Sequence, residues 1–123
     1  MHIFDTSAII EFIDGSEKGS MVKNLLEKES AAISSITINE LLICAYTTER
    51  ETLEQLINSF HVFSFNSVVA YKSVEIEQNL RKKGKPMGKL DIFIAAVAQL
   101  YDIPLVTCDK GFKNIDDLKI VFI

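Results

Sequence analysis

The chain has few of the residues that mark fibrous, disulfide-rich and membrane proteins. Its 123 residues include 2 cysteines, 2 prolines and 5 glycines. The low glycine and proline content excludes collagen-like and low-complexity chains. No apolar run approaches the roughly 18 residues that suggest a transmembrane helix, and Asp5 interrupts the first apolar stretch before a signal peptide could form. We therefore expect a protein of the cytoplasm without a membrane segment.

Several motifs are missing as well. Cys44 and Cys108 lie in apolar surroundings without zinc-site spacing, which predicts two reduced and mostly buried thiols. The sequence has no P-loop and no G-x-G-x-x-G motif, so a nucleotide cofactor is not supported. His2 and His61 have no acid or nucleophile beside them, and we interpret them as structural or exposed residues.

The overall composition is that of one globular domain covering residues 1–123, with 48% apolar and 24% charged residues. The net charge of −4 argues against non-specific binding to nucleic acid. One segment without acids differs from this average, since it contains Arg81, Lys82, Lys83, Lys85 and Lys89. These cations could stabilise the end of a helix or contact phosphates, and the sequence leaves both readings open.

Short apolar strands alternate with helical patterns along the whole chain. The expected strands cover residues 2–4, 31–34, 62–65, 105–108 and 119–123. The expected helices run from Thr6 or Ser7 to Ile13, through residues 21–26, after a capping box at Thr37–Glu40, over 49–59, from Asn66 or Ser67 to Lys83, and from Asp91 to Ala98. This alternation predicts a three-layer α/β/α fold around a central, mainly parallel five-stranded sheet.

Four acids stand where strands end or helices begin. Asp5 and Asp109 follow strands, and Glu40 and Asp91 lie near helix starts. Because the carboxyl ends of parallel strands meet at one edge, these acids could share one cleft. Close carboxylates repel one another unless a cation is bound. An oxygen-only set without histidine or thiolate suits one or two Mg²⁺ or Mn²⁺ ions.

Each acid also has a structural explanation. Glu40 could complete the capping box with Thr37, Asp91 could favour the first turn of a helix, and Asp109 could begin an Asx turn. Asp5 is harder to explain in this way, because a carboxylate directly after a buried strand is costly unless it is paired or metal-bound.

Four segments around these acids resemble the motifs of the PIN domain nucleases. They are Ile3–Ser7, Ser34–Leu42, Gly88–Ala96 and Leu105–Asp109. The resemblance covers essentially the whole chain. Because the chain is small, it is most similar to the VapC-like toxins of toxin–antitoxin pairs.

This resemblance implies a PIN-like fold and a metal-dependent endoribonuclease whose catalytic, metal-binding acids are Asp5, Glu40, Asp91 and Asp109. Thr6, Ser7 and Thr107 would be polar supports, and Lys82, Lys83, Lys85 and Lys89 would contact substrate phosphates. Asp116 or Asp117 could supply the fifth acid that many relatives carry. The expected partners are RNA, a second copy in a homodimer, and a VapB-like antitoxin whose tail reaches the active site.

Three alternatives remain at the level of sequence. One is a PIN nuclease of RNA processing, and another is an inactive PIN fold that only binds a partner. The most distant is a receiver-like phospho-acceptor module, which is also a doubly wound α/β domain.

Overall fold

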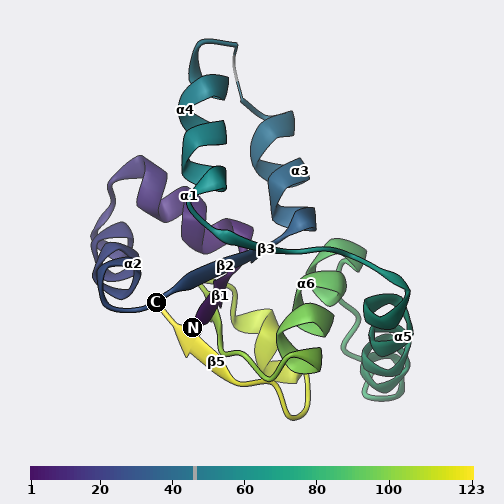
Figure 1. Cartoon of the computed structure of the whole chain (residues 1–123). Coiled ribbons are helices and arrows are strands. Elements are labelled where there is room, and N and C mark those ends of the chain that lie inside the picture. Colours follow the sequence, from purple (N-terminus) through teal and green to yellow (C-terminus); the bar gives the residue numbers. More distant parts are fainter. Residues whose placement is uncertain (46) are drawn as a thin grey trace.

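The computed structural model describes residues 1–45 and 47–123, and the side chains of residues 1–45 and 49–123 (Figure 1). The strands are β1 (His2–Phe4), β2 (Ala31–Ser34), β3 (His61–Phe63), β4 (Leu105–Thr107) and β5 (Ile120–Phe122). The helices are α1 (Thr6–Asp14), α2 (Glu17–Lys28), α3 (Ser35–Ile43), α4 (Thr47–Asn58), α5 (Ser67–Lys82), α6 (Lys89–Leu100) and the 3₁₀ helix η1 (Lys110–Asn114).

All strand pairs of the sheet are parallel, and the order is β3-β2-β1-β4-β5. The predicted α/β fold with a five-stranded parallel sheet is therefore confirmed. The chain crosses over after β3, so that β4 lies beside β1 on the other side. This order differs from the 2-1-3-4-5 order of receiver-like folds, which removes the receiver alternative.

The strands alternate their side chains between two hydrophobic cores. Ile3, Ala32 and Leu105 face the core that α5, α6 and η1 cover. Their neighbours in sequence face the opposite core, under α1, α2 and the ends of α3 and α4. This period of two places one buried residue on each face, as a sheet covered on both sides requires.

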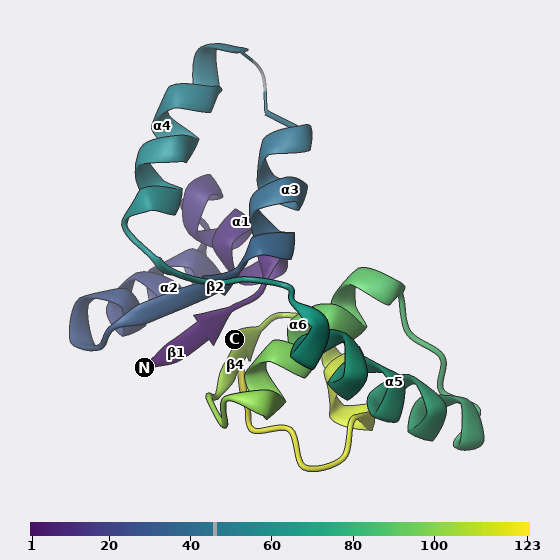
Figure 2. The ribbon, with the colours of Figure 1, turned by 45° about the vertical axis from the view of Figure 1, so that its right-hand side comes forward.

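Two helix pairs flank the site described below. Gly19 of α2 lies so close to α1 that an added Cβ would stand 2.1 Å from the Glu11 carbonyl oxygen, so only glycine fits there. Helices α3 and α4 extend away from the sheet on the side of α1 (Figures 1 and 2).

No helix within the described residues is long and apolar enough to cross a membrane.

Several local predictions are wrong, because caps depend on exact backbone geometry. The N-cap of α1 is Asp5 rather than Thr6 or Ser7, since Asp5 accepts a hydrogen bond from the backbone of Ala8. The N-cap of α3 is Ser34, so Thr37 and Glu40 do not form the predicted capping box.

Other boundaries shift by a few residues. Helix α6 begins at Lys89 instead of Asp91, and β3 ends at Phe63 instead of Phe65. The cysteine prediction is also partly wrong, because Cys44 is exposed and Cys108 is only half-buried. Both thiols are free, as expected.

Candidate active site

The carboxyl edge of the sheet carries a network of acids and hydroxyl groups. Asp5 follows β1 directly, and Asp109 stands two residues after Thr107, the last residue of β4. Helix α3 begins directly after β2, which brings Glu40 to the same edge. Asp91 comes from the first turn of α6.

Asp5 is the centre of this network and is only 3% exposed. One carboxylate oxygen accepts hydrogen bonds from the hydroxyl of Ser7 at 2.7 Å and from the backbone N–H of Ala8 at 2.9 Å. The other accepts from the hydroxyl of Thr107 at 2.5 Å. Burial raises the pKa of Asp5 above its usual value, although these three hydrogen bonds oppose the rise. The predicted supports Ser7 and Thr107 therefore touch Asp5 itself.

Glu40 is held by the third predicted support. The hydroxyl of Thr6 donates to Glu40 Oε1 at 2.6 Å and lies 3.3 Å from the hydroxyl of the buried Thr37. The sequence pattern predicts Thr37 in a capping box, whereas the structure places it beside Thr6. No local pattern could have shown this, because 31 residues separate the two threonines.

Asp109 has the turn geometry that the sequence suggested as its structural explanation. Its Oδ1 accepts from the backbone N–H of Gly111 at 2.8 Å and caps η1. The backbone N–H of Asp109 donates to Thr107 Oγ1 at 2.9 Å, which ties this turn to the group that binds Asp5. Asp109 is exposed, so its carboxylate remains open to solvent.

Asp91 shows that the four acids influence one another. Partial burial and the charges of Asp109, Glu40 and Asp5 raise the pKa of Asp91 to about 6. A first-turn acid that only stabilised its helix would have a lowered pKa instead. The structure thus brings the four predicted acids into one electrostatic cluster, with Asp91 carrying the largest unfavourable interaction.

The donor set of this cluster suits a hard divalent cation. It offers carboxylate and hydroxyl oxygens, and its mutual repulsion is what a bound cation would relieve. Within residues 1–45 and 47–123, no three acids, histidines or cysteines already stand at metal-binding distance from a common point. The fit therefore rests on the chemistry of the oxygens and on the raised pKa of Asp91 rather than on a preformed geometry.

The predicted phosphate contacts do not form one free patch. Lys83 bonds Asp116 and the carbonyl oxygen of Asn114, and Lys89 bonds Glu77 at 2.8 Å. Lys82 and Lys85 are exposed near the end of α5. Among the described residues, no ion pair joins any of these four lysines to the four acids, and Lys89 stands two residues before Asp91.

The candidates for a fifth acid also lie elsewhere. Asp116 pairs with Lys83, and both Asp116 and Asp117 line a small depression with residues of α5 and Gln99. They precede β5 and thus lie toward the amino edge of the sheet, away from Asp5.

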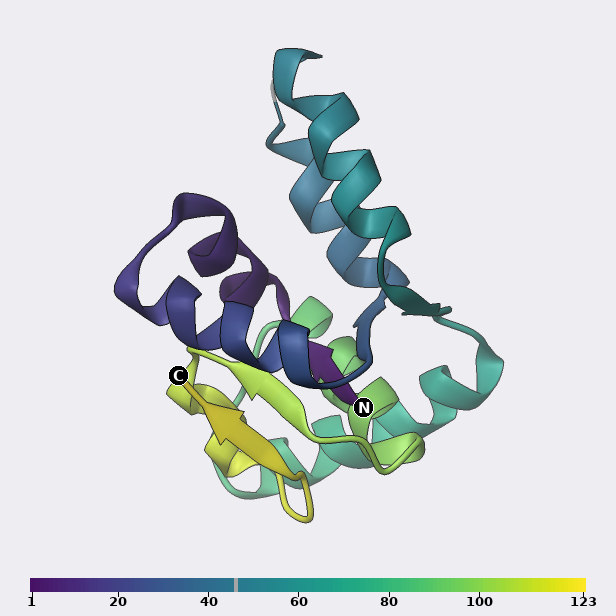
Figure 3. The ribbon, with the colours of Figure 1, turned by 60° about the vertical axis from the view of Figure 1, so that its left-hand side comes forward.

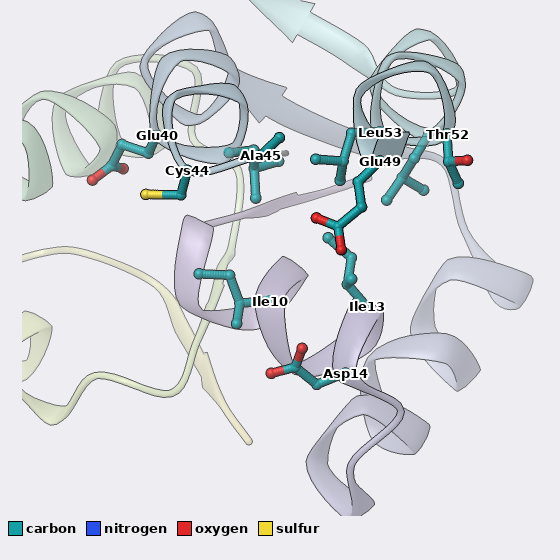
Figure 4. Close-up of a pocket in the computed structure, with 11 residues that line it drawn as sticks. Ile10, Ile13, Asp14, Glu40, Cys44, Ala45, Glu49, Thr52 and Leu53 are labelled. Atoms are coloured by element: carbon teal, nitrogen blue, oxygen red, sulfur yellow. The ribbon is translucent and has the colours of Figure 1, made fainter. Parts of the chain in front are cut away.

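An apolar groove beside the acids was not anticipated from sequence. It has a volume of about 480 Å³ and lies between α1, α3 and α4. Ile13 of α1 lies opposite Leu53 of α4, and Ile10 lies opposite Cys44 and Ala45, with Glu40 at that end of the groove (Figure 4). Both isoleucines are more than 40% exposed, which a sequence-based assignment of apolar residues to the core could not reveal.

Comparisons with known proteins agree with this architecture. Residues 3–118 match the PIN domain family. The chain is 31% identical to a ribonuclease VapC of Rickettsia bellii over 97% of this chain and 93% of that relative. It is 28% identical to a ribonuclease VapC1 of Haemophilus influenzae over 97% and 95% of the two chains.

Solved structures share the same fold. The structure of DNA-bound VapBC from Salmonella typhimurium superposes on this chain with a TM-score of 0.82 at 27% identity. The match covers 98% of this chain and 96% of that chain. VapBC-1 from nontypeable Haemophilus influenzae gives 0.85 at 23% identity over the same shares. The chain belongs to the PIN domain family. Its full-length match to VapC makes it a VapC-type member of that family.

Proposed function

We propose that this chain is a divalent-metal-dependent endoribonuclease and the toxin of a VapBC-type pair, with Asp5, Glu40, Asp91 and Asp109 as its catalytic acids. The observation that supports this most is the cluster itself, in which burial and the charges of three acids, Asp109, Glu40 and the buried Asp5, raise the pKa of Asp91 to about 6. A single domain, residues 1–123, would carry out the reaction. It would act on RNA in the cytoplasm.

The residues have distinct tasks in this proposal. The four acids would hold Mg²⁺ or Mn²⁺, which supplies Lewis-acid activation of the phosphodiester and of the attacking water. Ser7 and Thr107 orient both oxygens of Asp5, so that a metal meets a preset carboxylate. Thr6 does the same for Glu40. A bound cation would lower the pKa of Asp91, which is about 6 without it, and would keep the carboxylate ionised.

Cleavage of cellular RNA tests the nuclease. Purified protein free of antitoxin should cut total RNA into discrete fragments with Mg²⁺ or Mn²⁺ and not with EDTA. Fragment ends would then identify the substrate. An absence of fragments with either ion, while Mn²⁺ binding is still seen by calorimetry, would favour the alternative of an inactive PIN fold that only binds a partner.

The apolar groove fits an antitoxin segment. Several solved neighbours are described as toxin–antitoxin complexes, including one from Klebsiella pneumoniae. In this chain, Asp14, Glu40 and Glu49 line the groove beside its apolar residues. An apolar segment with basic side chains would bury Ile10 and Ile13 and neutralise these acids. Because Glu40 belongs to both sites, such a segment would end beside the catalytic acids.

Binding of the antitoxin can be followed at Cys44. This exposed thiol lines the groove, so a bound antitoxin should protect it from iodoacetamide. Co-expression with the product of an adjacent small gene provides the probe. We expect Ile13→Glu to abolish co-purification and protection, whereas Lys28→Gln on α2 should leave both intact. An unprotected Cys44 in the co-purified wild-type complex would place the antitoxin on another surface, and full protection in Ile13→Glu would show that Ile13 is not needed for its binding.

The dimer has a candidate interface on α5. Val68, Tyr71 and Val74 lie on one side of this helix and are 55%, 81% and 49% exposed. Such a row of apolar side chains is unusual on a monomer and suits a two-fold contact. Light scattering should therefore give twice the chain mass, and Tyr71→Glu should give a folded monomer. A dimer that survives this substitution would require a different interface.

A further inference from the structure

We propose that Lys18, in the first turn of α2, contacts a backbone phosphate of the RNA beside the catalytic acids and positions the strand for cleavage. This inference rests on the proposed ribonuclease function and adds to it a residue from an element outside the four motif segments. It also replaces the lysine-rich segment around residue 83 as the main phosphate contact.

The direction of α2 brings Lys18 to the carboxyl edge of the sheet. Helix α2 ends at Lys28, three residues before β2 begins at Ala31, so its last turn lies at the amino edge. Its first turn must then lie toward the opposite edge. Figure 3 shows the turn between α1 and α2 on the side toward which the arrows of β4 and β5 point.

Tight packing fixes this first turn beside the site. Gly19 leaves no room for a side chain against the carbonyl of Glu11, and the hydroxyl of Ser16 caps α2 and bonds the carboxylate of Glu11. Glu11 lies one helical turn after Ser7, the residue that bonds Asp5. The start of α2 is thus anchored about one turn of α1 away from the acids.

The end of β4 meets α1 at the same place. The backbone N–H of Cys108, directly before Asp109, donates to the hydroxyl of Ser7 at 3.1 Å. Ser7 also donates to Asp5, so the residues that follow β1 and β4 and the start of α1 are joined at one point of the carboxyl edge. The first turn of α2 packs on α1 one turn further along.

Lys18 is available for a ligand. It is exposed and takes part in no ion pair within the described part of the chain, whereas Lys83 and Lys89 are paired with acids. Four clustered carboxylates repel an approaching phosphate backbone, and a cation on their rim offsets that repulsion. A lysine acts here as a point charge that positions the strand without reading bases.

Steady-state cleavage of a labelled oligoribonucleotide tests this role. We expect Lys18→Gln to raise KM about fivefold with kcat within about twofold. The slope of log(1/KM) against log salt concentration should fall by about 0.7, the value for one phosphate contact on a single strand. Lys18→Arg should restore both. Lys28→Gln, a lysine on the same helix at the amino edge, is the matched control and should behave as wild type.

Unchanged KM and salt dependence in Lys18→Gln would overturn the proposal, as would an equal effect of Lys28→Gln. A lower kcat together with a lower Tm would indicate a structural role instead and overturn it too. If the wild type cleaves no RNA, the nuclease proposal fails, but fluorescence anisotropy with the same oligonucleotide still decides about Lys18. Affinity about fivefold weaker in Lys18→Gln supports the contact, and equal affinity overturns it.

Discussion

Two sets of acids in this molecule have opposite electrostatic surroundings. Glu77 accepts hydrogen bonds from Lys89 and lies near Arg81, and these contacts lower its pKa. Asp91 has burial and three other carboxylates around it, and its pKa rises to about 6. Both side chains are carboxylates, and their burial and the charges of their neighbours set the two pKa values apart.

This difference separates acids that the fold neutralises from acids that it leaves for a ligand. None of the ion pairs in the described part of the chain includes the four clustered acids. Uncompensated carboxylates lower the free energy of unfolding, so stability does not explain their presence. A divalent cation explains it, since it would convert the repulsion into binding energy.

The largest effect should come from removing one clustered acid. Asp5→Asn keeps an oxygen to cap α1 but loses the charge at the centre of the cluster, so cleavage should fall about a hundredfold or more. The paired acid Asp116 provides the control, and Asp116→Asn should cleave as wild type does. Circular dichroism establishes that both variants fold. A similar loss in the two variants would remove the distinction between the two sets of acids.

Metal binding should produce the next largest effect. Mn²⁺ at about 100 times its dissociation constant should stabilise the wild type by about 2.7 kcal/mol, which corresponds to a Tm increase of roughly 10 °C. Differential scanning fluorimetry measures this shift, and EDTA should reverse it. Asp91→Asn should show a much smaller shift. An equal shift in that variant would place the cation at some other group.

The smallest effect concerns the repulsion at Asp91 without metal. The folded state holds the proton of Asp91 up to about pH 6, whereas the unfolded chain releases it near its ordinary pKa of 3.8. Ionisation of Asp91 therefore costs stability as the pH rises from about 4 to 6, and this cost persists above that range. Allowing for solvent screening, we expect about 1–2 kcal/mol.

Asp91→Asn should accordingly raise the Tm of the EDTA-treated protein at pH 7.5 and leave it unchanged at pH 4. Glu77→Gln, which removes an acid with cationic partners, should give no such increase. Thermal unfolding followed by circular dichroism at the two pH values decides the matter. A pH-independent gain in Asp91→Asn would assign the effect to packing instead of charge.

The predictions from sequence that are confirmed concern features that depend on residues adjacent in the chain. Apolar strands ending in an acid marked β1 and β4, because a short buried strand leaves a recognisable run of apolar residues. The predictions that failed depend on contacts across the chain. Cys44 lies in an apolar segment and yet is exposed, because α3 extends away from the sheet and only part of its surface is covered.

The amino-acid sequence by itself determined the alternation of strands and helices and the position of the acids at their ends, since both follow from side-chain polarity along the backbone. Only the tertiary structure decided which groups meet. Thr6 bonds Glu40 across 34 residues, and Asp5 bonds Thr107 across 102. Such contacts depend on how the helices cross the sheet, and that crossing is set by the packing of whole elements.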